Sequence, residues 1–213
     1  MVTTQEKLFL LKEADNYFDR NSVKPNKYIL NAMKFLQPSL NDHVMEIGCS
    51  NGATLSKIKS IYGSKVYGLD PSKKATIYAK KKFKLENIYS DTFLNFKLKK
   101  KFDIIIDGGF LHVTPNNIIN KTIEKISNMM KANLYFILWN YDTPYSYIND
   151  WKYHKNIKSY KRNYINVINT INNKLYLLSK KQFMLGTGKE IKFYNEKINI
   201  DKIITTMIYK KIK

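Results

Sequence analysis

The chain has 213 residues, of which 37 are Lys or Arg and 17 are Asp or Glu, so its formal net charge is +20. Hydrophobic residues make up 44% and aromatic residues 14%, which is enough apolar material for a folded core and excludes a disordered basic tail. The single cysteine, Cys49, excludes an internal disulfide framework and a multi-cysteine zinc site.

The positive charge is carried almost entirely by lysine, because Arg20 and Arg162 are the only arginines. Arginine is the residue that reads bases and holds phosphates in a fork, so this pattern favours solvated helix surfaces over a polyanion-binding face. No apolar run approaches the ~20 residues that a membrane span needs. The first residues show no basic segment followed by an apolar one, so we expect no secretory signal and a cytoplasmic location.

Helices are expected at the start of the chain, and strands alternating with helices after it. Residues 5–37 predict helix, with a break at Lys24-Pro25. Strands are expected at 43–48, 65–70, 87–90, 102–107 and 133–140, and helices at 51–62, 72–83 and 116–131. Residues 102–107 are almost continuously apolar, as is typical of a strand in a parallel sheet that is covered on both faces.

The second half departs from this alternation. Residues 141–173 are polar and aromatic without a clear period, and 174–185 and 202–212 predict a closing pair of strands. The pattern predicts one α/β domain over residues 1–213, built on a doubly wound Rossmann-like sheet of about seven strands with helices on both faces and an antiparallel last strand. Residues 1–40 would form a helical cap on this domain, and 141–173 an insert between the fifth and sixth strands.

The turns after the first two predicted strands carry glycines and a carboxylate. The first strand runs into Glu46-Ile47-Gly48-Cys49-Ser50-Asn51-Gly52, and the second ends at Asp70-Pro71. Ligands of doubly wound sheets bind at the carboxyl ends of the strands, where glycines let a ligand approach the main chain. The glycine spacing does not match the dinucleotide pattern, whereas Asp70 lies where a carboxylate could accept ribose hydroxyls.

These residues resemble the motifs of the class I S-adenosylmethionine-dependent methyltransferases. EIGCSNG resembles the first motif of that family, with Ser50 where a glycine usually stands, and LDPS resembles the second, acidic motif. Asp91-Thr92 and the block FDIIIDGGFLHVTP at 102–115 extend the resemblance over residues 43–140 and the two closing strands.

The resemblance implies a set of residues around the cofactor. Glycines and small residues would line its methionine part, Asp70 its ribose hydroxyls, and Asp91 with Thr92 its adenine. Residues of the first helix would close over it, with Arg20 on the carboxylate; helix termination before Pro25 explains that segment equally well. The expected cofactor-binding residues are Tyr17, Arg20, Glu46, Gly48, Ser50, Gly52, Asp70, Pro71, Asp91, Thr92, Asp107 and Gly108.

Two histidines are candidates for a general base if the acceptor is a hydroxyl. His112 follows the fourth strand and is the better placed, and His154 in the insert is the second candidate; His43 precedes the first strand, at the opposite edge of the sheet. Asp107 and Asp142 could pair on a metal ion, but the sequence offers no third ligand, so no metal is expected.

The insert mixes tyrosines with cations, which suits a flat or sugar-like ligand carrying phosphate. Insertions at this place commonly form the acceptor lid in the resembled family, so Tyr160, Lys161, Arg162 and Tyr164 are expected to bind substrate. The chain is similar to small methyltransferases of capsule and sugar-modification pathways, which implies O-methylation of a small anionic acceptor, such as a nucleotide-activated sugar, a phosphoramidate or another surface-polysaccharide precursor. The alternatives are an RNA methyltransferase or RNA-binding protein using the basic surface, and a protein that binds the cofactor without catalysis.

Overall fold

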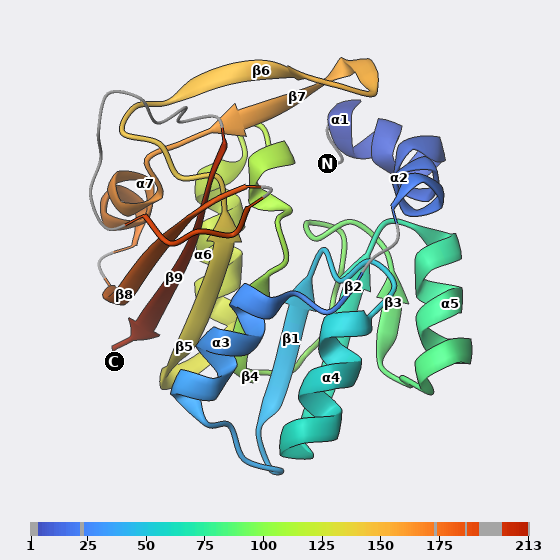
Figure 1. Ribbon diagram of the computed structural model, residues 1–213, viewed down its shortest axis with the longest axis vertical. Helices are drawn as coiled ribbons and strands as arrows, with labels where there is room; N and C mark the ends of the chain where they lie inside the picture. Colours follow the sequence, from blue (N-terminus) through green and yellow to red (C-terminus); the bar gives the residue numbers. More distant parts are fainter. Residues whose placement is uncertain (1–3, 22–23, 173, 186, 192–201, 213) are drawn as a thin grey trace.

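The computed structural model describes residues 4–21, 24–172, 174–185, 187–191 and 202–212. Seven strands form one sheet in the order β3-β2-β1-β4-β5-β9-β8 (Figure 1). Strands β1 to β5 pair in parallel, and β9 lies antiparallel between β5 and β8. The strand bounds are β1 His43–Ile47, β2 Lys65–Asp70, β3 Ile88–Ser90, β4 Phe102–Asp107, β5 Met130–Asn140, β8 Leu175–Met184 and β9 Ile203–Lys211. The expected doubly wound sheet with an antiparallel last strand is confirmed.

Helices cover both faces of the sheet because successive residues of its strands point to opposite sides. Met45 and Ile105 pack with α6 and α7 in one buried cluster, whereas Val44 and Ile104 pack with α3, α4 and α5 in the other. The helix bounds are α3 Lys27–Leu36, α4 Ala53–Tyr62, α5 Lys73–Phe83, α6 Ile119–Met129 and α7 Tyr164–Ile171. Among the described residues, no helix combines the length and apolar character of a bilayer span.

The N-terminal segment is one helical rod with a wider turn in its middle. It comprises α1 (Thr4–Leu8), the π-helical turn η1 (Phe9–Glu13) and α2 (Ala14–Arg20). The rod ends at Arg20, before the expected break, because Asn21 is already extended. Helix α3 starts anew after Asn26, whose side chain accepts hydrogen bonds from the amides of Tyr28 and Ile29 and so caps the helix.

The insert contains more regular structure than its sequence pattern indicates. A hairpin of β6 (Tyr147–Trp151) and β7 (His154–Lys161) precedes helix α7. The hairpin and the N-terminal rod lie together above one end of the main sheet (Figure 1). Because one face of the hairpin covers a cavity rather than the main core, it carries polar and aromatic side chains in place of an apolar alternation.

Candidate functional site

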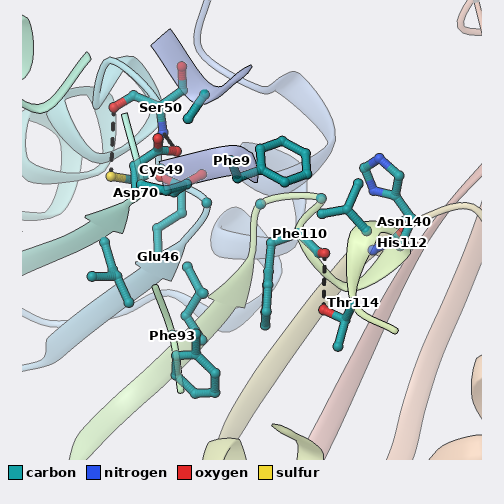
Figure 2. Close-up of a pocket in the computed structure, with 18 of the residues that line it drawn as sticks. Phe9, Glu46, Cys49, Ser50, Asp70, Phe93, Phe110, His112, Thr114 and Asn140 are labelled. Carbon is teal, nitrogen blue, oxygen red and sulfur yellow. Dashed lines mark hydrogen bonds between the residues drawn. The ribbon is translucent and has the colours of Figure 1, made fainter. Parts of the chain in front are cut away.

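A cavity of about 660 Å³ lies at the carboxyl ends of β1 to β5, beneath the N-terminal rod and the hairpin. Figure 2 shows side chains from the strand ends, from the loops that follow them and from the N-terminal rod around it. Ten residues expected at the cofactor or in catalysis line it: Tyr17, Glu46, Gly48, Ser50, Asp70, Pro71, Asp91, Thr92, Gly108 and His112. The topology therefore gathers residues that are far apart in the sequence around a single space.

The turn after β1 is held by main-chain and carboxylate contacts. The amide of Gly48 donates to the carbonyl of Leu69 over 2.8 Å, and Gly48 adopts a φ of 77°. Ser50 also has a left-handed φ, 45°, and its amide donates to Oδ2 of Asp70 over 2.8 Å. The other oxygen of Asp70 accepts from the amide of Ser72, also over 2.8 Å. Asp70 thereby fixes the first two motifs against each other.

Three carboxyl groups gather near this turn at low exposure to solvent. Burial, and then the charges of Asp70 and Asp107, raise the pKa of Glu46 well above its usual value. Burial raises the pKa of Asp70 to about 6, although the two amides that it accepts from oppose the shift. Oε2 of Glu46 has no hydrogen-bond partner among the described residues. This side of the cavity therefore favours a ligand that brings donors or positive charge.

Asp107 organises the loop after β4 rather than lining the cavity. Its Oδ1 accepts from the amides of Gly109, Phe110 and Leu111 over 3.0, 2.7 and 3.3 Å. Its Oδ2 accepts from Nδ2 of Asn140 at the end of β5 over 2.7 Å. Burial, the largest influence, raises its pKa to about 6. Asp107 thus shapes the loop that carries His112.

The other cofactor candidates divide into lining and supporting residues. Thr92 lines the cavity with a buried Oγ1 that lacks a partner in the described structure, and its amide donates to Oδ1 of Asp91 over 2.7 Å. Gly52 lies away from the cavity at the start of α4, with a φ of 72°, where a Cβ would come within 2.9 Å of Leu85. Arg20 forms an ion pair with Glu13, rather than extending over the turn.

His112 stands in a group of aromatic side chains on the other side of the cavity. Its ring stacks on Trp151 at 5.6 Å and meets Tyr141 edge-on at 5.4 Å. Burial, and then the charges of Lys161 and Arg162, lower its pKa to about 3, so the imidazole is neutral at physiological pH. His154 does not line the cavity: it begins β7, and its Nδ1 accepts from the amide of Asn156.

The four residues expected to bind substrate lie behind the cavity wall. Tyr164 is fully buried in the core. Arg162 is 2% exposed, and its guanidinium donates to the carbonyls of Leu111 and Thr114 and to Oδ1 of Asn116.

Lys161 is also buried, with Nζ 3.0 Å from the centre of the Tyr141 ring, and Tyr160 packs under the Arg162 guanidinium at 4.8 Å. None of the four is among the described lining residues. Their positions fit support of the cavity wall better than direct contact with a ligand.

Sequence reasoning missed the residues that tie the roof of the cavity together. The side chain of Gln5 donates to the carbonyls of Val113 and Lys158 and accepts from the amide of Lys158 over 3.0 Å. Nε1 of Trp151 donates to Oε1 of Glu13 over 3.3 Å. The polar side chain of Gln5 at an inward position of the first helix could have indicated such a contact. Its partners lie more than 100 residues away in the sequence, so the sequence does not identify them.

The two aspartates weighed as a metal pair are engaged elsewhere. Oδ2 of Asp142 lies 2.6 Å from Nζ of Lys180, and Oδ1 accepts from the amide of Tyr164 over 3.0 Å. In the described part of the chain, no three His, Cys, Asp or Glu residues are grouped as a metal site would require.

Parts of the sequence are similar to known methyltransferases. The model of the Methyltransferase domain family matches residues 45–134. The putative methyltransferase 235L of Invertebrate iridescent virus 6 is 25% identical over 150 residues, 58% of this chain and 56% of that protein. An uncharacterized methyltransferase of Bacillus thuringiensis strain Al Hakam is 30% identical over 89 residues, 41% of this chain and 42% of that protein. The matches therefore span about half the length of these relatives.

Comparison with solved structures shows the same fold along the whole chain. The 1,6-didemethyltoxoflavin-N1-methyltransferase of Burkholderia thailandensis, with S-adenosylhomocysteine bound, superposes with a TM-score of 0.76 at 9% identity, covering 100% of this chain and 92% of that one. The N-methyltransferase NodS of Bradyrhizobium japonicum WM9, also with S-adenosylhomocysteine, gives 0.60 at 14% identity, covering 99% and 100%. Residues 45–134 are therefore similar to a methyltransferase domain, and the chain as a whole has the Rossmann-like fold of the class I S-adenosylmethionine-dependent methyltransferases.

Proposed function

We propose that the protein transfers a methyl group from S-adenosylmethionine to a small acceptor molecule. The observation that carries this proposal is the cofactor side of the cavity. Buried polar atoms of Glu46, Ser50 and Thr92 line it without partners in the described structure, and Gly48 and Gly108 leave the main chain open to a ligand. Unsatisfied buried groups cost free energy, so a ligand that pairs them binds favourably.

Each part of the cofactor has a place in this proposal. Asp70 would accept the ribose hydroxyls, and Asp91 with Thr92 would bind the adenine edge. Ser50 and Glu46 would face the methionine part, whose ammonium group suits the acidic surroundings. The bound cofactor supplies the reactive methyl group on a sulfonium. The chain has to hold the acceptor in line with that methyl group and exclude water, and we assign this role to the roof of rod and hairpin.

The acceptor is proposed to be small because one cavity of about 660 Å³ has to hold it beside the cofactor. The expected anionic acceptor rested partly on Tyr160, Lys161, Arg162 and Tyr164, which lie behind the wall. The expected O-methylation rested on the similarity to sugar-modification methyltransferases. The structural neighbours include N-methyltransferases, so we propose transfer to either nitrogen or oxygen. The capsule-pathway role and the cytoplasmic location remain predictions.

An RNA acceptor receives less support from the cavity. Its described lysines, Lys24 and Lys27, are outnumbered by Glu6, Glu46, Asp70 and Asp91. A polynucleotide would need a basic path that converges on the reacting atoms. We therefore propose that most of the net charge of +20 lies outside the reaction.

Binding of S-adenosylmethionine measured by calorimetry tests the proposal directly. Asp70→Ala should weaken binding by about 100-fold, because each lost hydrogen bond to a charged group is worth about 1.5–3 kcal/mol. Asp150→Ala is the matched control, since the Asp150 side chain is 72% exposed on the hairpin. Circular dichroism should show that both variants are folded. Absence of binding to the wild-type protein would contradict the proposed function.

A further inference from the structure

We propose that the acceptor is a planar aromatic or heteroaromatic molecule with an acidic N–H or O–H group, and that it is methylated as its anion. This inference rests on the proposed methyl transfer and names the substrate class of that same site. Two independent features carry it: the side chains that line the acceptor side of the cavity, and the two buried cations behind them.

Aromatic rings dominate the acceptor side of the cavity. Trp151 contacts three of them: the ring of His112 stacks on it at 5.6 Å, Phe9 meets it edge-on at 6.4 Å, and Tyr17 lies tilted at 6.3 Å. Figure 2 shows Phe9, Phe110 and His112 around the same space. The remaining aromatic lining residues on this side are Trp139, Tyr141 and Tyr153. Flat faces at several orientations bind a flat ligand by stacking and edge contacts, and offer a sugar ring few hydrogen-bond partners.

A layer of positive charge lies directly behind these rings. Nζ of Lys161 is 3.0 Å from the centre of the Tyr141 ring, on the side of the wall that carries β7. Arg162 follows it and is fixed to the His112 loop through the carbonyls of Leu111 and Thr114. Both side chains are at most 7% exposed, so water screens their charges only weakly.

Several other charged or titratable groups face the same space. Glu13 lies on the roof, where it is paired with Arg20 and accepts from Trp151. Tyr17 and Tyr141 are phenols whose pKa values burial raises, so both are neutral at physiological pH. Glu6 of the rod also lines the cavity. Beside His112, the charges that act on the ring are those of Lys161 and Arg162. The potential next to this ring is therefore positive, which disfavours a cationic amine and stabilises an anion there.

The lowered pKa of His112 agrees with this potential. Burial is its largest cause, and Lys161 and Arg162 add to it. A base whose conjugate acid is this strong removes protons poorly. The same positive charges that oppose protonation of His112 would favour ionisation of an acidic group stacked beside it. The positive charge near the acceptor thus favours its ionised form, and no side chain has to act as a general base.

The reaction then proceeds in two balanced steps. The acceptor first loses its N–H or O–H proton to water, and the proton passes to the solvent. The lone pair on the resulting anionic nitrogen or oxygen forms a bond to the methyl carbon while the carbon–sulfur bond breaks. The electron pair of that bond stays on sulfur, so an anion and a sulfonium cation give a neutral methylated product and a neutral thioether. Two opposite charges are neutralised in the transition state, which a largely apolar, aromatic lining favours over water.

A set of model acceptors tests the substrate class. The wild-type protein is supplied with S-adenosylmethionine and with 4-nitrophenol, uracil, cyclohexanol or glucose 1-phosphate, and S-adenosylhomocysteine formation is measured. We expect the two planar acidic compounds to react at least ~10-fold faster than the other two. Faster transfer to glucose 1-phosphate, or no difference, would overturn the inference and leave the methyltransferase function standing. Failure to bind S-adenosylmethionine would instead remove the proposed function itself.

Binding of the planar compounds can be followed without turnover. Both tryptophans of the chain, Trp139 and Trp151, line the cavity, so intrinsic fluorescence reports on it. Uracil should quench this fluorescence in the presence of S-adenosylhomocysteine. Trp151→Leu should weaken uracil binding by about 10-fold and Trp151→Phe should restore most of it, because stacking on one aromatic ring is worth about 1–3 kcal/mol. Equal affinity in wild type and Trp151→Leu would contradict the stacking.

The role of the charge is tested by the pH profile of kcat, which reports ionisation in the bound state. In Lys161→Met the acidic limb with 4-nitrophenol should move up by about 1 pH unit, since loss of a nearby cation raises the pKa of a bound acid. Lys155→Met is the control on the same strand, because Lys155 is exposed, and its profile should match wild type. A Lys161→Met variant that is merely less active, with an unmoved limb, would show that Lys161 serves packing alone. If Lys161→Met does not fold, the wild-type limb decides: it should lie below the solution pKa of the acceptor, and a limb above it overturns the inference.

Discussion

The two sides of the cavity are built on different principles. The proposed cofactor side is made of strand ends, and its groups are fixed by hydrogen bonds from main-chain amides, such as those of Ser50 and Ser72 to Asp70. The proposed acceptor side is covered by the N-terminal rod and the hairpin. Gln5 joins the rod to the hairpin, and Arg162 joins the end of the hairpin to the loop after β4. The pairing of the sheet therefore places the first side, whereas the second side depends on a few hydrogen bonds between segments far apart in the sequence.

The largest effect is expected from removing the buried hydrogen bonds of the Arg162 side chain. Arg162→Met should lower the free energy of unfolding by about 3–5 kcal/mol, because the carbonyls of Leu111 and Thr114 lose their buried charged donor. Chemical denaturation measures this directly. Arg162→Lys should recover only a minor part, since one ammonium cannot reproduce the guanidinium fork. A loss below about 1 kcal/mol in Arg162→Met would show that the acceptor side does not depend on these hydrogen bonds.

A pH-dependent comparison tests the surroundings of His112. Its pKa is about 3 in the folded protein and about 6.5 when unfolded, so below pH 6.5 the unfolded state binds a proton that the folded state does not. As pH falls from 6.5 towards 3, wild type should therefore lose stability relative to His112→Phe by about 1.4 kcal/mol per pH unit.

The relative measurement is needed because two buried carboxyls act in the opposite direction. Asp70 and Asp107 have folded-state pKa values of about 6 against 3.8 otherwise, so each destabilises the fold increasingly as pH rises from about 4 to 6. These contributions are common to wild type and His112→Phe and cancel in the difference of their free energies of unfolding. A difference that stays constant between pH 4 and pH 6.5 would contradict the buried, neutral state of His112.

The smallest effect is expected on the cofactor side, at the position where the resembled family usually has glycine. Ser50 holds a φ of 45°, which costs a residue with a Cβ about 1 kcal/mol. Ser50→Gly should therefore raise the free energy of unfolding by about 0.5–1 kcal/mol. Ser50→Ala keeps the strain and should show no such gain. If the two variants are equally stable, backbone strain does not govern this turn.

The sequence predicted the fold, and the gathering of the motif residues around one cavity, for the same physical reason. Glu46, Gly48 and Asp70 stand directly at the ends of apolar strands, and the pairing of those strands brings them together without further information. Local periodicity and local motifs are enough for such a site.

The acceptor side could not be predicted in this way. Gln5 and Glu13 act through partners 153 and 138 residues away. The cations of the insert were expected to face a ligand, but Arg162 is buried against the loop after β4. A hairpin sequence without alternating apolar residues does not indicate which of its faces is covered. Only the packing of three separate segments decides that.

The central place of β9 has a consequence for how the protein is made. Residues 203–211 pair with β5 on one side and with β8 on the other, although they follow all other described strands of this sheet in the sequence. Until they emerge from the ribosome, β5 has an unpaired edge and β8 has no strand to join it to the sheet. Completion of the sheet therefore requires contacts between residues far apart in the sequence, which form slowly. Until it is complete, unpaired strand edges are exposed and can pair with other chains. The nascent chain is most in need of protection from aggregation during the synthesis of the residues between β5 and β9.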